Sequence, residues 1–212
     1  MTPAAFYWIG GSPCAGKSSV AATLADRHGL RHVECDWASA DRVARMAGRK
    51  LPAYEELSAL STCERLSRSP EWQADRELAF YREQFEFVLD ELSPAEPAIV
   101  EGADLLPDLL QRAGVGMNRA VWLVPTPEFQ IRHYAAREWV SEYLKDCADP
   151  QAAFRNWMCR DVLFAERIRD LATTVGGRVI VVDGTMSLEE VVRVVGEHLG
   201  LWGARPASRA GN

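Results

Sequence analysis

The sequence lacks the features of a secreted, membrane or nucleic-acid-binding protein. No basic stretch followed by an apolar segment opens the chain, so we expect no signal peptide. No apolar run approaches the ~20 residues that a membrane-spanning helix needs. The formal net charge is −6, which argues against a broad basic surface. We therefore expect neither a membrane nor a nucleic acid among the partners.

Cysteines are few, and they lack the spacing that is typical of metal or redox sites. Their number is odd and no C-x-x-C pair occurs, so neither a disulfide framework nor a zinc site is expected. This pattern favours the reducing cytoplasm as the location of the protein. The five cysteines are Cys14, Cys35, Cys63, Cys147 and Cys159.

The size of the chain suits one domain. It has 212 residues, of which 48% are hydrophobic, and this is enough for a sizeable core. Internal repeats and low-complexity blocks are absent from the sequence. We predict a single domain over residues 1–203 and a flexible tail over residues 204–212.

Apolar runs alternate with helical patterns along the chain. The runs are continuous, as expected for parallel strands covered on both faces. They occupy residues 6–9, 31–35, 98–100, 120–124 and 178–182. Helical patterns cover residues 18–28, 71–92, 127–145, 151–174 and 187–199, the last opened by a Ser187-x-x-Glu190 capping box. This alternation predicts an α/β fold around a parallel sheet.

One sequence motif is complete. Residues 11–18 read Gly-Ser-Pro-Cys-Ala-Gly-Lys-Ser and fit G-x-x-x-x-G-K-[ST], between a predicted strand and a predicted helix. The amides of such a glycine-containing loop and the following helix N-terminus favour phosphate anions. We therefore predict a nucleoside triphosphate site, with Lys17 on the β and γ phosphates and Ser18 on Mg²⁺. The residues expected to contact the nucleotide are Gly11, Ser12, Pro13, Cys14, Ala15, Gly16, Lys17, Ser18 and Ser19.

The classes of proteins that carry this loop differ in a second sequence motif. The N/T-K-x-D stretch of GTPases and the L-S-G-G signature of ABC-type ATPases are both absent. The chain is too short for an AAA+ module with its helical lid. The remaining features are a compact domain, acids at strand ends and arginines on late helices. These features are typical of a small kinase.

The chain resembles the P-loop kinase superfamily that contains nucleoside-monophosphate, shikimate and gluconate kinases, chloramphenicol phosphotransferase and zeta-toxin-type sugar kinases. Four stretches carry the resemblance: residues 11–18, Asp36 after the second strand, Val100-Glu101-Gly102, and residues 182–192. It implies a P-loop three-layer sandwich with a five-stranded parallel sheet in the order 2-3-1-4-5, helices on both faces and a helical lid at about residues 126–160. The Asp-Gly-x-Pro-Arg pattern of adenylate-type kinases and a shikimate-kinase-like triple glycine are absent, which argues against both substrates.

Two acids follow strands at the sheet edge where ligands bind. The resemblance implies that Asp36 holds the acceptor hydroxyl and takes its proton, while Glu101 helps Ser18 to hold Mg²⁺. The alternatives are a helix cap or turn residue for Asp36 and a surface acid for Glu101. Glu34 is a further candidate for the acceptor side, since it precedes Asp36 by two residues.

Arginines gather after the fourth strand. Phosphoryl transfer needs positive charge over the γ-phosphate. Arg137 and Arg160 flank the predicted lid turn, and we expect them to act with Lys17 in catalysis. The alternative for each arginine is an exposed helix face paired with nearby acids. The six arginines are Arg132, Arg137, Arg155, Arg160, Arg167 and Arg169.

Together these features predict an ATP-dependent kinase with ATP and Mg²⁺ as cofactors. It would move the γ-phosphate to a hydroxyl of a small-molecule acceptor, which the sequence does not identify. A nucleotide hydrolase or switch without an acceptor, and a non-catalytic nucleotide-binding module, are the alternatives. The protein is expected to be a monomer or a homodimer.

Overall fold

A five-stranded parallel sheet forms the centre of the protein. The computed structural model describes residues 6–35 and 40–202. The strands lie in the order β2-β3-β1-β4-β5. They are β1 Phe6–Gly11, β2 Arg31–Glu34, β3 Ala98–Glu101, β4 Ala120–Pro125 and β5 Arg178–Val182. The order confirms the fold expected from the sequence.

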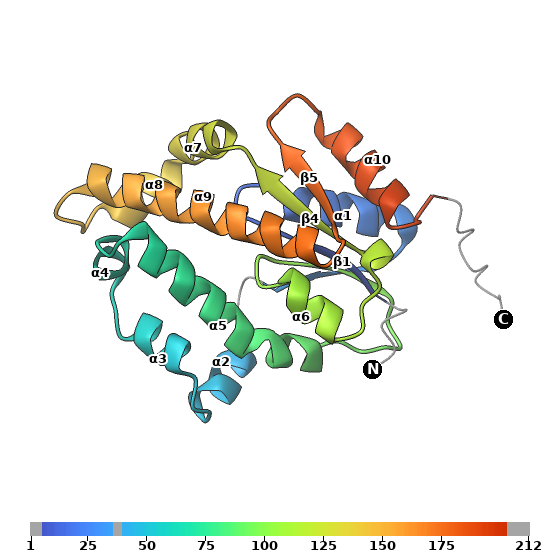
Figure 1. Ribbon diagram of the computed structural model, residues 1–212, viewed down its shortest axis with the longest axis horizontal. Helices are drawn as coiled ribbons and strands as arrows, with labels where there is room; N and C mark the ends of the chain where they lie inside the picture. Colours follow the sequence, from blue (N-terminus) through green and yellow to red (C-terminus); the bar gives the residue numbers. More distant parts are fainter. Residues whose placement is uncertain (1–5, 36–39, 203–212) are drawn as a thin grey trace.

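Helices cover both faces of this sheet (Figure 1), which makes three layers. Helices α1 (Lys17–His28) and α10 (Leu188–His198) pack on one face, around Ile9, Ile99 and Leu123. Helices α5 (Pro70–Asp90), α6 (Pro107–Arg112) and α9 (Pro150–Thr174) pack on the other, around Trp8, Val100 and Trp122. Every residue of β3 and β4 is buried, because both faces are covered and neither strand lies at a sheet edge.

The strand register sets the position of the functional residues. Ile9 of β1 pairs with Glu101 of β3, and β1 then leads into the phosphate loop. Glu34 of β2 also pairs with Glu101. The carboxyl ends of β1, β2 and β3 therefore meet at one edge, where open α/β sheets bind ligands.

Helix α10 begins as predicted, whereas the helix predicted over residues 127–145 is interrupted. Ser187 and Glu190 form both hydrogen bonds of the capping box. The continuous helix predicted over residues 127–145 is instead two helices, α7 (Pro127–Ala135) and α8 (Glu138–Leu144). Arg137 interrupts them with an extended backbone and places its guanidinium over the Tyr134 ring. Neither Pro nor Gly marks this break, so the sequence pattern alone did not predict it.

Short helices occupy segments that the sequence pattern left unassigned. Three of them lie between β2 and α5: α2 (Ala40–Ala47), α3 (Pro52–Ser58) and α4 (Thr62–Leu66). A 3₁₀ turn, η2 (Met117–Arg119), precedes β4. Each is too short to show a clear helical period in the sequence.

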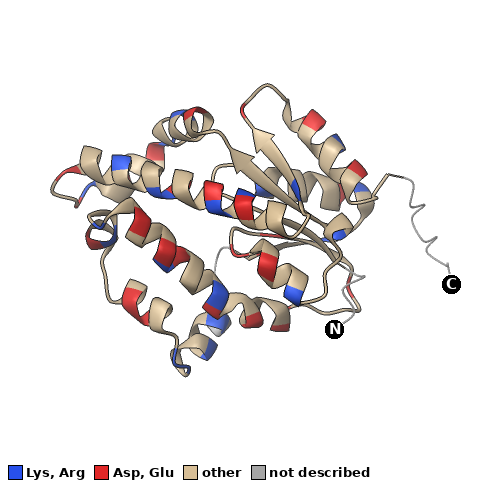
Figure 2. Cartoon of the chain, in the orientation of Figure 1, with Lys and Arg blue, Asp and Glu red and all other residues tan. Residues whose placement is uncertain are grey.

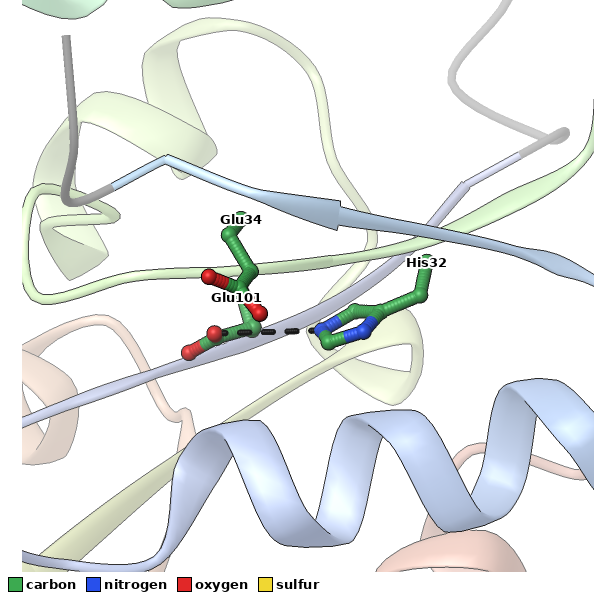
Figure 3. Close-up of side chains that lie close together, drawn as sticks. All are labelled: His32, Glu34 and Glu101. Carbon is green, nitrogen blue, oxygen red and sulfur yellow. Dashed lines mark ion pairs between the residues drawn. The ribbon is translucent and has the colours of Figure 1, made fainter.

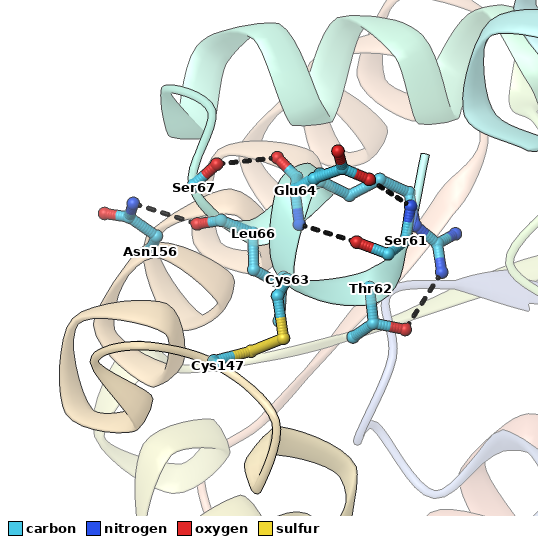
Figure 4. The surroundings of a disulfide bond; sticks show 9 residues. Ser61, Thr62, Cys63, Glu64, Leu66, Ser67, Cys147 and Asn156 are labelled. Atoms are coloured by element: carbon cyan, nitrogen blue, oxygen red, sulfur yellow. Dashed lines mark hydrogen bonds between the residues drawn. A yellow bond between two sulfur atoms is a disulfide. The ribbon is translucent and has the colours of Figure 1, made fainter. Parts of the chain in front are cut away.

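A disulfide joins Cys63 of α4 to Cys147, between α8 and α9 (Figure 4). The sequence analysis expected no disulfide framework and did not predict this pair. The two residues are 84 positions apart in the sequence, and the fold brings their Cα atoms to 5.1 Å. The spacing of cysteines in the sequence does not reveal such a pair, because only the tertiary structure brings the two residues together. The cysteine pattern therefore no longer supports the predicted cytoplasmic location, which stays a prediction.

In the part of the chain that the structure describes, none of the helices combines the length and the apolar character of a membrane span. The predicted tail over residues 204–212 lies outside the described residues.

Candidate functional site

The phosphate loop folds tightly against β4. Gly11 has a φ of +128°, and a Cβ atom there would lie 2.0 Å from the Leu123 carbonyl oxygen, so only glycine fits. The amide of Ser12 donates a hydrogen bond to the same oxygen at 3.0 Å. Cys14 and Gly16 both adopt left-handed backbone conformations, with φ values of 64° and 78°. These turns give the loop the curvature that an anion-binding loop needs.

Helix α1 presents its N-terminus directly after this loop. No side chain of the described residues caps it, and its first turn carries no acid. The positive end of the helix dipole is therefore left for an anion. Lys17 is buried and donates from Nζ to the Ser12 carbonyl oxygen at 3.2 Å, while Ser18 and Ser19 are exposed. The helix dipole and the ammonium group favour the phosphate anions of a triphosphate, and the exposed hydroxyl oxygen is a ligand for its Mg²⁺.

A hollow of about 330 Å³ lies beside the loop. Cys14, Ala15 and Gly16 form its floor, and Phe129 and His133 of α7 form a wall. The two rings lie 3.9 Å apart between centroids. The sequence analysis did not select this pair as site residues. Its size and its aromatic wall suit the base and sugar of a nucleotide.

Glu101 lies buried at the end of β3, on the face that α1 covers (Figure 3). Its carboxylate lies 3.8 Å from His32 Nε2, and Glu34 completes a group whose ligand atoms all lie within 4.8 Å of one another. The alternative of a solvated surface acid does not hold, because Glu101 is only 2% exposed. Carboxylate and imidazole groups at this distance are able to hold a divalent cation.

Arg137 lies over the loop from the lid side. Its guanidinium donates to the Cys14 sulfur at 3.6 Å and lies 4.7 Å from the centre of the Tyr134 ring. Burial raises the pKa of the Cys14 thiol, against the opposing charges of Arg137 and Lys17. A thiol of raised pKa is a weak nucleophile, which fits a packing role for this side chain.

Arg160 faces away from solvent and is ion-paired. It contacts Glu77 of α5, and its Nε lies 2.5 Å from the Asp161 carboxylate. Arg167 similarly pairs with Asp75 at 2.6 Å. Figure 2 shows that both basic and acidic residues occur along α5 and α9. Arg160 and Arg167 therefore link α9 to α5. The alternative of an exposed helix face does not describe Arg160, because its side chain is 16% exposed and its partner Glu77 lies on another helix. The catalytic role of Arg160 stays a prediction.

Asp161 is a buried acid near Lys17 that the sequence analysis did not select. It is 1% exposed and lies on the buried stripe of α9 with Trp157, Phe164 and Ala165. Burial is the main cause that raises its pKa, and the charges of Arg160 and Lys17 oppose the shift. Helical spacing would have revealed it, since position 161 falls one turn from apolar neighbours on both sides.

Asp36, the predicted base, lies outside the described residues. The described chain ends before it at Cys35, whose amide donates to the Glu101 carbonyl oxygen at 2.8 Å. The role of Asp36 stays a prediction.

The strand order and the loop define a P-loop kinase-like fold, and solved structures of this kind are similar to the chain. A shikimate kinase from Acinetobacter baumannii in complex with shikimate matches at 18% identity and a TM-score of 0.49, over 93% of each chain. TT1252 from Thermus thermophilus matches at 19% identity and a TM-score of 0.49, over 92% of this chain and 97% of that chain. The YorR protein from Bacillus subtilis, in complex with phosphorylated GDP, matches at 14% identity and a TM-score of 0.48, over 92% and 96%.

No family model and no curated protein matches the sequence. At these identities the solved structures say nothing about the substrate, so function is argued from the site of this chain alone.

Proposed function

We propose that the protein is an ATP-dependent phosphotransferase that moves the γ-phosphate to a hydroxyl of a small acceptor. The observation that carries the proposal is the position of Arg137, whose guanidinium lies against the phosphate loop at Cys14. A binding module needs only the loop, whereas transfer needs a second cation over the developing γ-phosphate charge.

Each remaining group has a place in this proposal. Lys17 and the loop amides hold the triphosphate, and Ser18 and Glu101 hold Mg²⁺, which lowers the negative charge on the phosphates. Asp36 orients the acceptor hydroxyl and accepts its proton. Residues 126–160 act as a lid that brings Arg137 to the nucleotide and excludes water.

The test is a screen of acceptors with Mg-ATP, scored by ADP release above the rate of hydrolysis. Arg137→Gln should lower acceptor-dependent release at least about a hundredfold, because it removes a charge that stabilises the transition state. Arg155→Gln is the matched control, since Arg155 is an exposed arginine of the same lid.

An unchanged rate in Arg137→Gln would remove the observation on which the proposal depends. ADP release that no acceptor raises above the hydrolysis rate would favour the hydrolase or switch. Binding of Mg-ATP without any ADP release would favour the non-catalytic module.

A further inference from the structure

A second cavity lies between the helices that follow β2 and those that follow β4. Its volume is about 110 Å³, a third of that of the hollow beside the loop. Helices α3, α4 and α5 form one side, and α8 and α9 form the other. The lining residues that matter here are Arg65, Trp72, Glu77, Tyr143, Trp157 and Arg160.

This cavity adjoins the phosphate loop. Leu66 and Trp157 line it, and both belong to the packed cluster against which Cys14 of the loop rests. Asp161, the neighbour of the lining residue Arg160, is close enough for its charge to act on Lys17 and Cys14. A molecule held here would lie near the phosphate loop.

A covalent link joins the two sides of the cavity. The Cys63–Cys147 disulfide holds α4 to the turn between α8 and α9 (Figure 4). Asn156 of α9 adds a hydrogen bond to the Leu66 carbonyl oxygen at 3.0 Å. The two sides of the cavity are therefore held together before any ligand arrives, which lowers the entropic cost of binding.

The two arginines of the cavity differ in their partners. Arg160 is balanced by Glu77 and Asp161. Arg65 is half-buried, and the one hydrogen bond that its side chain makes among the described residues goes to the Thr62 hydroxyl at 3.3 Å. No carboxylate of the described residues forms an ion pair with it. A partly buried guanidinium without a counter-charge favours an anion, and its planar fork matches a carboxylate or a phosphate.

Aromatic rings supply the remaining walls. Tyr143 and Trp157 lie 5.2 Å apart between centroids, and Trp72 lines the cavity from α5. Flat apolar walls of this kind pack against a ring. Typical sites for drug-sized ligands measure roughly 300–1,000 Å³, so the occupant here must be small.

We propose that this cavity is the acceptor site, and that the acceptor is a small hydroxylated ring compound whose carboxylate or phosphate group binds Arg65. The inference rests on the proposed phosphotransferase function and names the chemical class of its acceptor. The aromatic walls hold the ring, and the hydroxyl points toward the loop.

Calorimetric titration of the full chain, saturated with a non-hydrolysable ATP analogue and Mg²⁺, tests this assignment. The probes are matched pairs that differ only in charge: glucuronate with glucose, and shikimate with its methyl ester. A hexose phosphate distinguishes a phosphate-bearing acceptor from a carboxylate-bearing one. We expect the charged member of at least one pair, or the hexose phosphate, to bind at least about tenfold more tightly than its neutral counterpart.

Arg65→Gln should abolish that preference, and Arg65→Lys should retain part of it because it keeps the charge without the fork. Arg76→Gln is the control, since Arg76 pairs with Glu56 and does not line the cavity. Equal binding of charged and neutral probes, a preference that survives in Arg65→Gln, or no binding of any probe would overturn the acceptor assignment. Failure of the ATP analogue itself to bind would instead overturn the proposed function.

Discussion

The phosphate loop takes its groups from one run of consecutive residues, 11–19, whereas the cavity beside it is assembled from five helices between residues 52 and 174. The loop owes its shape to local backbone conformation and to contact with the neighbouring strand β4. The cavity depends on ion pairs, ring contacts and a disulfide between residues far apart in the sequence. Changes in the loop should therefore affect nucleotide binding, and changes around the cavity should affect acceptor use.

The largest effect is expected from Lys17→Ala. It removes the ammonium group that we propose contacts the β and γ phosphates, so turnover should fall by ~10³-fold, and most of the thermal stabilisation by Mg-ATP should be lost. Lys50→Ala is the matched control, because Lys50 is exposed and remote from the loop in sequence. Melting curves with and without Mg-ATP measure both; an unchanged shift in Lys17→Ala would contradict the loop assignment.

Asp36→Asn should separate the two regions most clearly. If Asp36 is the base, acceptor-dependent turnover falls at least about a hundredfold. Affinity for ATP should change less than about tenfold, or ~1.4 kcal/mol, because the loop contacts do not involve this side chain. Steady-state kinetics and nucleotide titration measure the two quantities. Full acceptor-dependent activity in the variant would make Asp36 a cap residue.

The double variant Cys63→Ser/Cys147→Ser tests the covalent part of the cavity. The disulfide closes a loop of 84 residues, and loss of such a link typically costs about 2–4 kcal/mol of unfolding free energy. The acceptor KM should rise because α4 is no longer held to the lid, while affinity for ATP stays within about tenfold.

Cys159→Ser is the control for that variant, since Cys159 is an exposed free cysteine on α9. Denaturant unfolding and acceptor titration provide the measurements. Equal stability and equal KM in the double variant would show that packing alone positions α4.

A smaller, pH-dependent effect is expected from Asp161→Asn. The pKa of Asp161 is raised by burial, so the folded state holds this proton more tightly than the unfolded state does. The stability that Asp161 contributes is present below its unfolded pKa, about 3.9, and is lost as pH rises through the folded pKa. Wild type should therefore lose stability relative to Asp161→Asn as pH increases from the unfolded pKa of Asp161 to its raised folded pKa.

Asp170→Asn, an exposed acid on the same helix, should show no such trend. Melting temperatures between acidic and neutral pH provide the measurement. A difference between wild type and Asp161→Asn that stays constant with pH would mean that the carboxyl is not desolvated.

The sequence alone was able to predict the local features of the protein, but not the contacts between residues far apart in the chain. The loop, the strands and the capping box at Ser187 are local, so spacing and residue type were enough to predict them. The partners of Arg160 and Cys63 were not predictable in this way, because Glu77 and Cys147 lie 83 and 84 positions away in the sequence. Asp161 is an intermediate case: the helical spacing contained the signal, but the residue type suggested a surface position.

Phosphorus NMR of a reaction with Mg-ATP and the charged acceptor probes tests the central claim most directly. The account predicts a phosphomonoester resonance that grows in step with ADP, at least about tenfold more slowly for Arg65→Gln at low acceptor concentration and ~10³-fold more slowly for Lys17→Ala. ADP that appears together with inorganic phosphate alone, whatever the acceptor, would contradict it and establish a hydrolase.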